Sequence, residues 1–276
     1  ATACIICLIF SFSCKRNTKT ESNTIIFDTL RVSTIHHQND DPNRLACNLQ
    51  INFIYPKVDQ NNAELNNIAS LFIEKTLDAS LAALSPEDAL DVFSKQYLSE
   101  FDELTWLDNL DESELNALGP ESGSEYVYYL TINNQVLYNK NNLLSFLVER
   151  HIYEGGAHGS NSTHGYVIDL STGNLITEDA FAGINYAKNL SDLMTNKLAS
   201  ENGLSDLQDL ESIGYINASD IAPNNNFTLD EKGITYYFNE YEIGAYFLGT
   251  TKIFIPYEEL SVYTAQDSPI NPLIGM

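Results

Sequence analysis

Apolar and polar positions alternate through the first part of the chain. The stretches 25–37 (IIFDTLRVSTIHH) and 44–55 (RLACNLQINFIY) alternate in this way and are rich in β-branched residues, a pattern typical of strands with one buried face. Residues 38–43, which lie between them, contain the turn-forming sequence Asn-Asp-Asp-Pro. The pattern therefore predicts an antiparallel pair of strands.

The apolar spacing becomes helical after residue 60. Residues 61–79 place their apolar side chains along one helical stripe. A second helix is expected to begin at Ser85, because serine can cap a helix and Pro86 suits the first helical position. Helical character fades through 106–118, and Gly-Pro at 119–120 ends it.

Strand patterns return in the second half. Segments 126–132, 134–139 and 143–153 predict a meander with Asn-rich turns, and segment 163–170 predicts a further strand before the Ser-Thr-Gly-Asn turn at 171–174. An amphipathic helix is expected over 185–200. The remaining predicted elements are strands at 227–230, 233–238 and 251–255 and a short helix at 256–260.

This order of elements predicts an α+β fold made of two small modules, each an antiparallel sheet with packed helices. The change from helices to strands places the expected boundary near residue 120. We expect an N-terminal module at 25–120 and a second module at 121–264, with a leader and tether at 1–24 and a tail at 265–276.

The first residues resemble a secretory leader. Residues 1–12 form an apolar run with the length of a signal-peptide core, and no Met or basic region precedes it, so we expect the natural start to lie upstream. Ser11-Phe12-Ser13-Cys14 resembles a lipobox, although Phe12 departs from the usual residue type. Acylation of Cys14 would attach the chain to a membrane. The polar stretch 15–24 would then be a tether, and its first basic residues favour a periplasm-facing protein over a surface-exposed one.

Composition narrows the function. The 276 residues are 43% hydrophobic, enough for a folded core, and 14 basic against 38 acidic residues give a formal net charge of -24. Such acidity repels the phosphates of nucleic acids, so we do not expect a nucleic-acid partner. It suits a basic protein partner. The alternative is that the acidic residues only keep the protein soluble. Cys47 lies in an alternating run and is expected to be a small buried apolar residue.

The segment Glu154-Gly155-Gly156-Ala157-His158-Gly159 is the first candidate site. Its glycines allow positive φ and a close approach of another chain or ligand. Glu154, His158 and His164 could bind zinc if they converged, but their spacing matches no zinc motif. The preferred interpretation is a structural corner in which His158 bonds to the backbone. The same loop is also a candidate contact surface for a ligand or partner.

Tyr241-Glu242-Ile243-Gly244-Ala245-Tyr246 is the second candidate. A carboxylate between two tyrosines could form a contact patch, because tyrosine supplies large contact area at low entropic cost. The alternative is a strand–helix junction in which Tyr241 packs on the core. The sequence contains neither a GxSxG nor a P-loop motif, and His36 and His37 would face opposite ways in a strand. We therefore expect no catalytic residue, no metal and no cofactor.

Four spaced blocks in the second half resemble a known family. They are Tyr-Glu-Gly-Gly-Ala-His-Gly-Ser at 153–160, Asp-Leu-Ser-Thr-Gly at 169–173, the run from Leu229 to Gly244, and Ile-Pro-Tyr-Glu-Glu-Leu at 255–260. Between Leu143 and Leu260 the chain resembles the extracellular domain of unknown function of RsiV-type anti-sigma factors. Residues 25–118 are similar in layout to the module that precedes this domain in RsiV and in the deacetylase PdaC.

The resemblance implies an α+β domain outside the cytoplasm that binds a ligand rather than converting a substrate. In the anti-sigma factors this domain binds lysozyme, which is basic. The chain departs from them because it shows no sigma-binding segment and no membrane-spanning helix, and it lacks the catalytic domain of the deacetylase.

We therefore expect a lipid-anchored envelope lipoprotein that binds a basic protein such as lysozyme, or peptidoglycan. The expected contacts are Glu154, Gly155, Gly156, His158, Tyr241 and Glu242. One alternative is a metal-assisted cell-wall hydrolase or deacetylase-associated enzyme that uses Glu154 and His158. The other is a structural component of an envelope complex.

Overall fold

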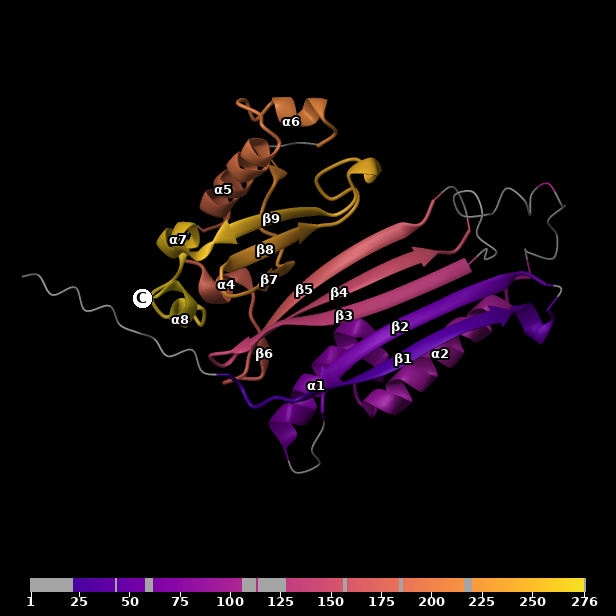
Figure 1. The fold of residues 1–276 in the computed structure, drawn as a ribbon. Coiled ribbons are helices and arrows are strands. Elements are labelled where there is room, and N and C mark those ends of the chain that lie inside the picture. Colours follow the sequence, from indigo (N-terminus) through magenta and orange to yellow (C-terminus); the bar gives the residue numbers. More distant parts are fainter. Residues whose placement is uncertain are drawn as a thin grey trace, which may run out of the picture.

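The α+β fold expected from the sequence is confirmed by a computed structural model (Figure 1). It describes residues 22–42, 44–57, 62–105, 113, 128–155, 158–183, 186–215 and 220–275. A large sheet contains β1 (Phe27–His37), β2 (Ala46–Pro56), β3 (Tyr128–Lys140), β4 (Leu143–Tyr153), β5 (Ser160–Asp169) and β6 (Asn174–Leu175), in that order. A small antiparallel sheet contains β7 (Phe227–Leu229), β8 (Gly233–Phe238) and β9 (Thr251–Pro256).

Two long helices follow β2 and carry the chain to β3. They are α1 (Ala63–Thr76) and α2 (Pro86–Asp102), and α2 begins after the predicted cap, Ser85. The Asn62 side chain accepts a hydrogen bond from the Leu65 amide (3.0 Å), and Ser85 accepts one from the Asp88 amide (3.1 Å). This crossover makes β2 and β3 parallel, whereas all other neighbouring strands of the large sheet are antiparallel.

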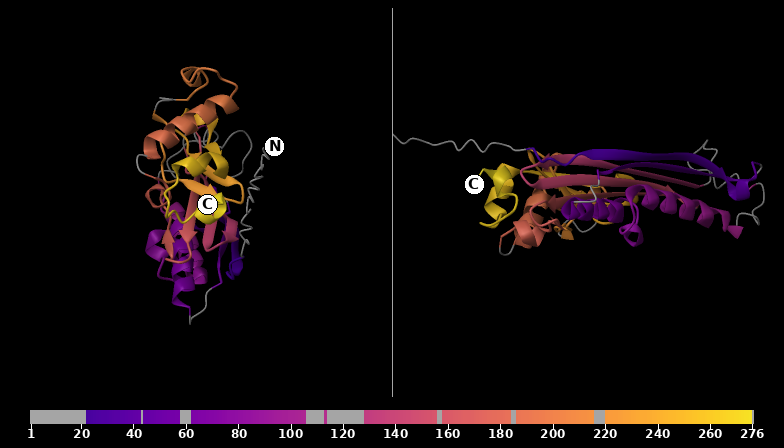
Figure 2. Two further views of the ribbon diagram at one scale, coloured as in Figure 1. Left: turned by 90° about the vertical axis from the view of Figure 1, so that its left-hand side faces the viewer. Right: turned by 90° about the horizontal axis from the view of Figure 1, so that it is seen from below.

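The other helices accompany the small sheet. They are α4 (Glu178–Phe181), α5 (Tyr186–Glu201), α6 (Asp209–Ser212), α7 (Tyr257–Leu260) and α8 (Asn271–Ile274). Figure 1 shows the small sheet beside β5, α5 beside β9, and α1 and α2 beside β1 and β2. Figure 2 shows that the molecule is long in the direction of the large-sheet strands and that the C-terminus lies at one end. Within the described ranges, no helix combines the length and apolar character needed to cross a membrane.

Strand β4 is buried on both faces at its beginning. Leu144, Phe146 and Val148 join the core beneath α1 and α2, whereas Leu143 joins the core around the small sheet and α5. Ser145, also on the second face, accepts a hydrogen bond from the Leu229 amide of β7 (3.0 Å). Because successive strand residues face opposite ways, the continuous apolar run of β4 connects the two cores.

The strands from both sides of residue 120 form one sheet. Leu49 of β2 and Phe146 of β4 belong to the same core, although the sequence assigns them to different modules. The predicted tail contains the fully buried Ile270, which packs in the core of the small sheet. The predicted fading helix at 106–118 lies outside the described residues except for residue 113, and α2 ends at Asp102.

The expected turn between strands 126–132 and 134–139 is wrong, because β3 runs without interruption through Asn133 and Asn134. Asn134 is buried, and its carboxamide accepts a hydrogen bond from the Ile54 amide (2.6 Å) and donates to the Ile54 carbonyl (2.7 Å). It also donates to Thr76 Oγ1 (3.2 Å). The side chain thus continues the β2–β3 contact beyond the last backbone pair, Asn52 with Asn133.

Replacing Asn134 by Ala should lower the free energy of unfolding by about 2–3 kcal/mol, because buried groups of Ile54 and Thr76 lose their partner. Urea denaturation measures this change. The neighbouring Asn133 is exposed, so Asn133→Ala is a matched control expected to change stability by less than about 0.5 kcal/mol. Equal losses for the two variants would contradict this role of Asn134.

A buried carboxyl should make stability depend on pH. Glu178 is 2% exposed, its Oε1 accepts a hydrogen bond from the Asn225 amide (2.8 Å), and burial raises its pKa. A raised carboxyl pKa in the folded state means that stability is lost as pH rises from the unfolded-state pKa through the folded-state pKa. Glu178→Gln keeps the acceptor and cannot ionise, so it should gain stability relative to the natural protein as pH rises from 4 to 7. Denaturation curves at several pH values would contradict this if the difference stayed constant.

Candidate functional site

The two candidate segments of the sequence meet in space. The Tyr246 hydroxyl, in the 3₁₀ turn η5 (Tyr246–Leu248), donates a hydrogen bond to the Gly159 carbonyl (2.9 Å). The His158 ring stacks on the Tyr246 ring with their centroids 4.0 Å apart. The β4–β5 connection and the β8–β9 connection therefore form one surface, although more than 80 residues separate them in sequence.

Tyr241 extends this surface. Its ring centroid lies 5.8 Å from that of Tyr246, and 61% of the residue is exposed. This exposure contradicts the alternative in which Tyr241 packs on the core. Its backbone has φ 67°, a left-handed conformation that residues other than glycine adopt uncommonly.

Polar side chains fix the β8–β9 connection against β5. Glu240 Oε1 accepts from the Asn161 carboxamide (2.7 Å) and Glu240 Oε2 from the Asn161 amide (3.2 Å). Asn239 Oδ1 accepts from the Thr163 amide (2.7 Å). These bonds use the edge of β5 that β6 leaves free, because β6 pairs with only the last residues of that strand. The position of the loop is therefore set before any partner arrives.

Glu242 is exposed and lies next to Tyr241, as the contact-patch interpretation requires. Its carboxylate accepts hydrogen bonds from the carboxamides of Asn224 (3.1 Å) and, more weakly, Asn239 (3.5 Å). Both donors are neutral carboxamides. They orient the carboxylate of Glu242 and do not neutralise its charge.

A third segment, after α6, completes the surface. Ala245 donates its amide to the Gly214 carbonyl (2.8 Å), and Tyr215 forms a bridge with Gly244. The Phe247 ring covers Gly214, where a Cβ atom would lie 2.5 Å from the ring, and 73% of Phe247 is exposed. The sequence analysis missed Phe247, and the density of aromatic residues over 241–247 was the available signal. We call His158, Tyr241, Tyr246 and Phe247 the aromatic tip.

The surroundings of the aromatic tip are acidic. Glu240 and Glu242 flank Tyr241 directly, whereas the nearest basic residues along the chain are Lys232 and Lys252. Such a surface attracts a positively charged partner and repels an anionic one.

The structure does not bring Glu154 and His158 together as a metal pair. The carboxyl of Glu154 lies near Tyr128 and Cys47 on the α2 side of the sheet, and partial burial, assisted by Glu100, raises its pKa. His158 Nδ1 lies 3.0 Å from the Gly159 carbonyl oxygen, as the corner interpretation predicts. Among the residues with described positions, no group of three His, Cys, Asp or Glu side chains could hold a metal ion.

The glycines of this corner have different roles. Gly155 has φ 85°, so it needs the freedom that only glycine has. At Gly159 a Cβ atom would lie 2.9 Å from both the Ile152 carbonyl oxygen and the Tyr129 hydroxyl. Gly156 lies outside the described residues.

The two cysteine predictions, for Cys47 and Cys14, have different outcomes. Cys47 is fully buried, as expected, and burial raises the pKa of its thiol to about 12, which keeps it protonated at neutral pH. Cys14, the expected lipidation site, lies outside the described residues.

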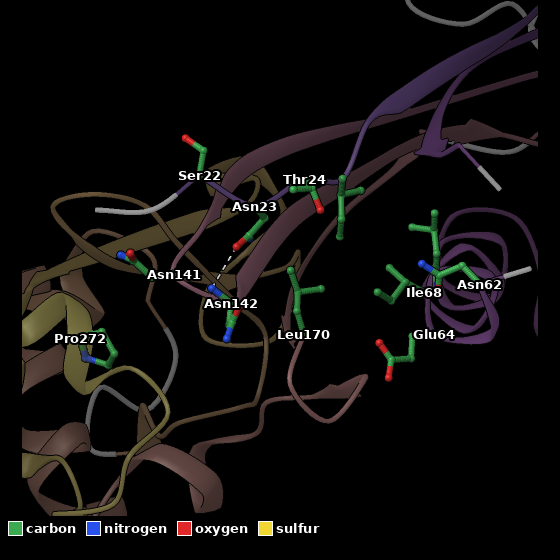
Figure 3. A pocket seen from close by; sticks show the side chains of 12 residues that line it. Ser22, Asn23, Thr24, Asn62, Glu64, Ile68, Asn141, Asn142, Leu170 and Pro272 are labelled. Atoms are coloured by element: carbon green, nitrogen blue, oxygen red, sulfur yellow. Dashed lines mark hydrogen bonds between the residues drawn. The ribbon is translucent and has the colours of Figure 1, made fainter. Parts of the chain in front are cut away.

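A polar cavity of about 500 Å³ lies near the first described residues (Figure 3). Asn23 and Asn142 face it and are joined by a hydrogen bond from the Asn142 amide to Asn23 Oδ1 (3.0 Å). Asn62 and Glu64 of the α1 N-terminal region line the other side, and Glu64 is the only ionisable side chain among the described lining residues. The described lining residues offer carboxamides and apolar side chains but no cation for an anionic ligand. The sequence analysis did not identify it.

Two family models match the chain. Residues 46–161 match the model described as "Deacetylase PdaC", and residues 174–258 match the model described as "Protein of unknown function (DUF3298)". These matches confirm the resemblance to a PdaC-type module followed by a domain of unknown function. The relation to RsiV remains a prediction. No curated protein matches the chain.

Two solved structures are similar over almost their whole length. A DUF3298 family protein from Pseudomonas aeruginosa has 12% identity and a TM-score of 0.60, covering 89% of this chain and 97% of its own, which shows a shared fold. A member of the DUF3298 family from Bacteroides fragilis has 30% identity and a TM-score of 0.79, covering 92% of this chain and 98% of its own. On that identity and coverage, the protein belongs to the DUF3298 family.

Proposed function

We propose that this protein is a non-enzymatic binding protein of the bacterial cell envelope and that its aromatic tip recognises a basic protein. The observation that carries the proposal is the exposure of Tyr241 and Phe247 beside the carboxylates of Glu240 and Glu242. A c-type lysozyme is the specific partner that we propose, because it is basic and because the sequence resembles RsiV-type domains.

Large aromatic residues that gather on an exposed surface are typical of a protein–protein interaction site. Tyrosine and tryptophan, together with arginine, carry much of the binding energy in protein interfaces. The tip is also held in place before binding, because Tyr246 bonds to Gly159 and Glu240 bonds to Asn161. A surface that is already ordered loses less conformational entropy when a partner binds.

Charge would then bring the partner to the tip. The protein carries a formal net charge of -24, and complementary charge raises association rates and lowers them again when salt is added. Glu242 adjoins Tyr241 and is exposed, whereas Glu240 is bonded to Asn161, so Glu242 is expected to face cationic groups of the partner.

Acylation of Cys14 and a periplasm-facing location are part of the proposal. Ser22 pairs with Lys140, next to the beginning of β4, whereas the tip contacts Gly159, beyond the end of β4. The 11 residues of β4 would separate these places by roughly 33 Å. A chain anchored through Cys14 would thus hold the aromatic tip on the side away from the membrane.

Calorimetric titration of residues 22–276 with hen lysozyme tests this function. Binding should weaken when ionic strength rises towards about 0.15 M, where surface charges are largely screened. The double variant Tyr241→Asn, Phe247→Ala should raise Kd at least about tenfold, because it removes both exposed rings. Asn tolerates positive φ, so the backbone at 241 should remain unstrained.

Val262→Ala is the matched control, because Val262 is 75% exposed but lies in η6 (Ser261–Tyr263), away from the tip. It should leave Kd unchanged. Glu242→Gln keeps the shape of the side chain and should reduce the salt dependence of binding. The absence of lysozyme binding at both ionic strengths would contradict the lysozyme proposal. Equal Kd values for the double variant and the natural protein would contradict the role of the tip.

A further inference from the structure

One face of the large sheet is polar and open to solvent over β1, β2 and β3. In β2, Leu49, Ile51 and Phe53 point towards α1 and α2 and are buried. The residues between them, Asn48, Gln50 and Asn52, therefore point to the opposite face. Gln50 is exposed and its two neighbours are half-buried. We call this side of β1, β2 and β3, together with the end of β4 at His151, the open face.

Strand register aligns the open-face side chains in rows. One row runs across four strands through Ser33, Gln50, Thr131 and His151, because each of these residues pairs with the next. The next row runs in the same manner through Arg31, Asn52, Asn133 and Glu149, so its two ends carry opposite charges. Gln135 follows Asn133 on the same face and is also exposed.

The open-face carboxamides have no hydrogen-bond partner among the residues that the structure describes. None of Asn48, Gln50, Asn52, Asn133 and Gln135 makes a side-chain hydrogen bond to any residue of the described part of the chain. Asparagine is disfavoured in strands, so three such residues on one solvent face act against the stability of the sheet. Asn134, one position away and on the buried face, satisfies its carboxamide fully. The hydrogen bonds of Asn134 explain why asparagine stands at that position. No such bonds explain the open-face carboxamides among the described residues.

Two tyrosines border these rows. Tyr129 and Tyr153 are paired across β3 and β4, and their rings stack with centroids 5.8 Å apart. Tyr129 is half-buried, and its hydroxyl lies close to Gly159. The open face therefore combines unpartnered carboxamides with an aromatic edge that leads towards the aromatic tip.

We propose that the open face binds an uncharged polysaccharide chain. A carboxamide both donates and accepts hydrogen bonds, and so does a sugar hydroxyl, so rows of carboxamides match rows of hydroxyls. The carboxamides are uncharged and the charges of Arg31 and Glu149 are opposite, so the face has no net charge that would favour phosphate or a strongly charged peptide. The strand spacing of about 4.8 Å sets hydrogen-bonding groups at regular steps across the sheet, as a repeating linear ligand requires.

Titration with cellohexaose and with hexa-N-acetylchitohexaose, followed by NMR of the amide and side-chain carboxamide signals of residues 22–276, tests this proposal. At least one oligosaccharide should produce saturable shifts of the Gln50, Asn52 and Asn133 carboxamides. The double variant Gln50→Ala, Asn52→Ala should weaken this binding at least about tenfold.

Gln96→Ala is the matched control, because Gln96 is an exposed carboxamide on α2, on the other side of the sheet. It should bind sugar as the natural protein does, and thermal unfolding should show all variants folded. The absence of saturable shifts with both oligosaccharides, shifts that map elsewhere, or equal binding by the double variant would overturn the proposal. Lysozyme binding by the double variant should be unchanged, so failure of this proposal is distinguishable from failure of the proposed function.

Discussion

The attachment of the small sheet to the free edge of β5 determines the position of the β8–β9 connection and of the face of the large sheet that stays exposed. Asn226 accepts from the Gly165 amide (2.7 Å) and donates to the Thr163 carbonyl (2.9 Å), while Asn239 and Glu240 bind the backbone further along the strand. Gly165 permits this contact, since a Cβ atom there would lie 2.4 Å from the Phe227 backbone. Side chains thus occupy an edge that would otherwise be open to another strand.

This attachment has two consequences for function. It carries the β8–β9 connection to the beginning of β5, where Tyr246 reaches Gly159 and the aromatic tip forms. It also covers the far face of the sheet over β4 and β5, as the Ser145–Leu229 bond shows, while the same face of β1, β2 and β3 remains exposed. The proposed protein site and the proposed polysaccharide-binding face therefore lie on one sheet and differ in chemistry.

Local signals in the sequence predicted the elements well. Ser85 and Pro86 identified the beginning of α2, and the alternating runs identified β1 and β2, because caps and strand alternation depend on nearby residues. The Asn133-Asn134 pair misled the prediction, since the partner of Asn134 is the remote Ile54. The convergence of 153–160 with 241–247 was also beyond reach, because no local pattern encodes which loop packs against which. Phe247 was missed although the aromatic residues over 241–247 were a local signal, and the contact of its ring with Gly214 is not encoded locally.

Hydrogen–deuterium exchange of the protein with and without lysozyme tests the central claim most directly, because it locates the contact as well as detecting it. The account predicts protection of 158–163, 209–215 and 239–249, the three segments that form and support the aromatic tip, with exchange of α1 and α2 unchanged. Protection confined to the helices or to the cavity near Asn23, with the tip unaffected, would contradict the account.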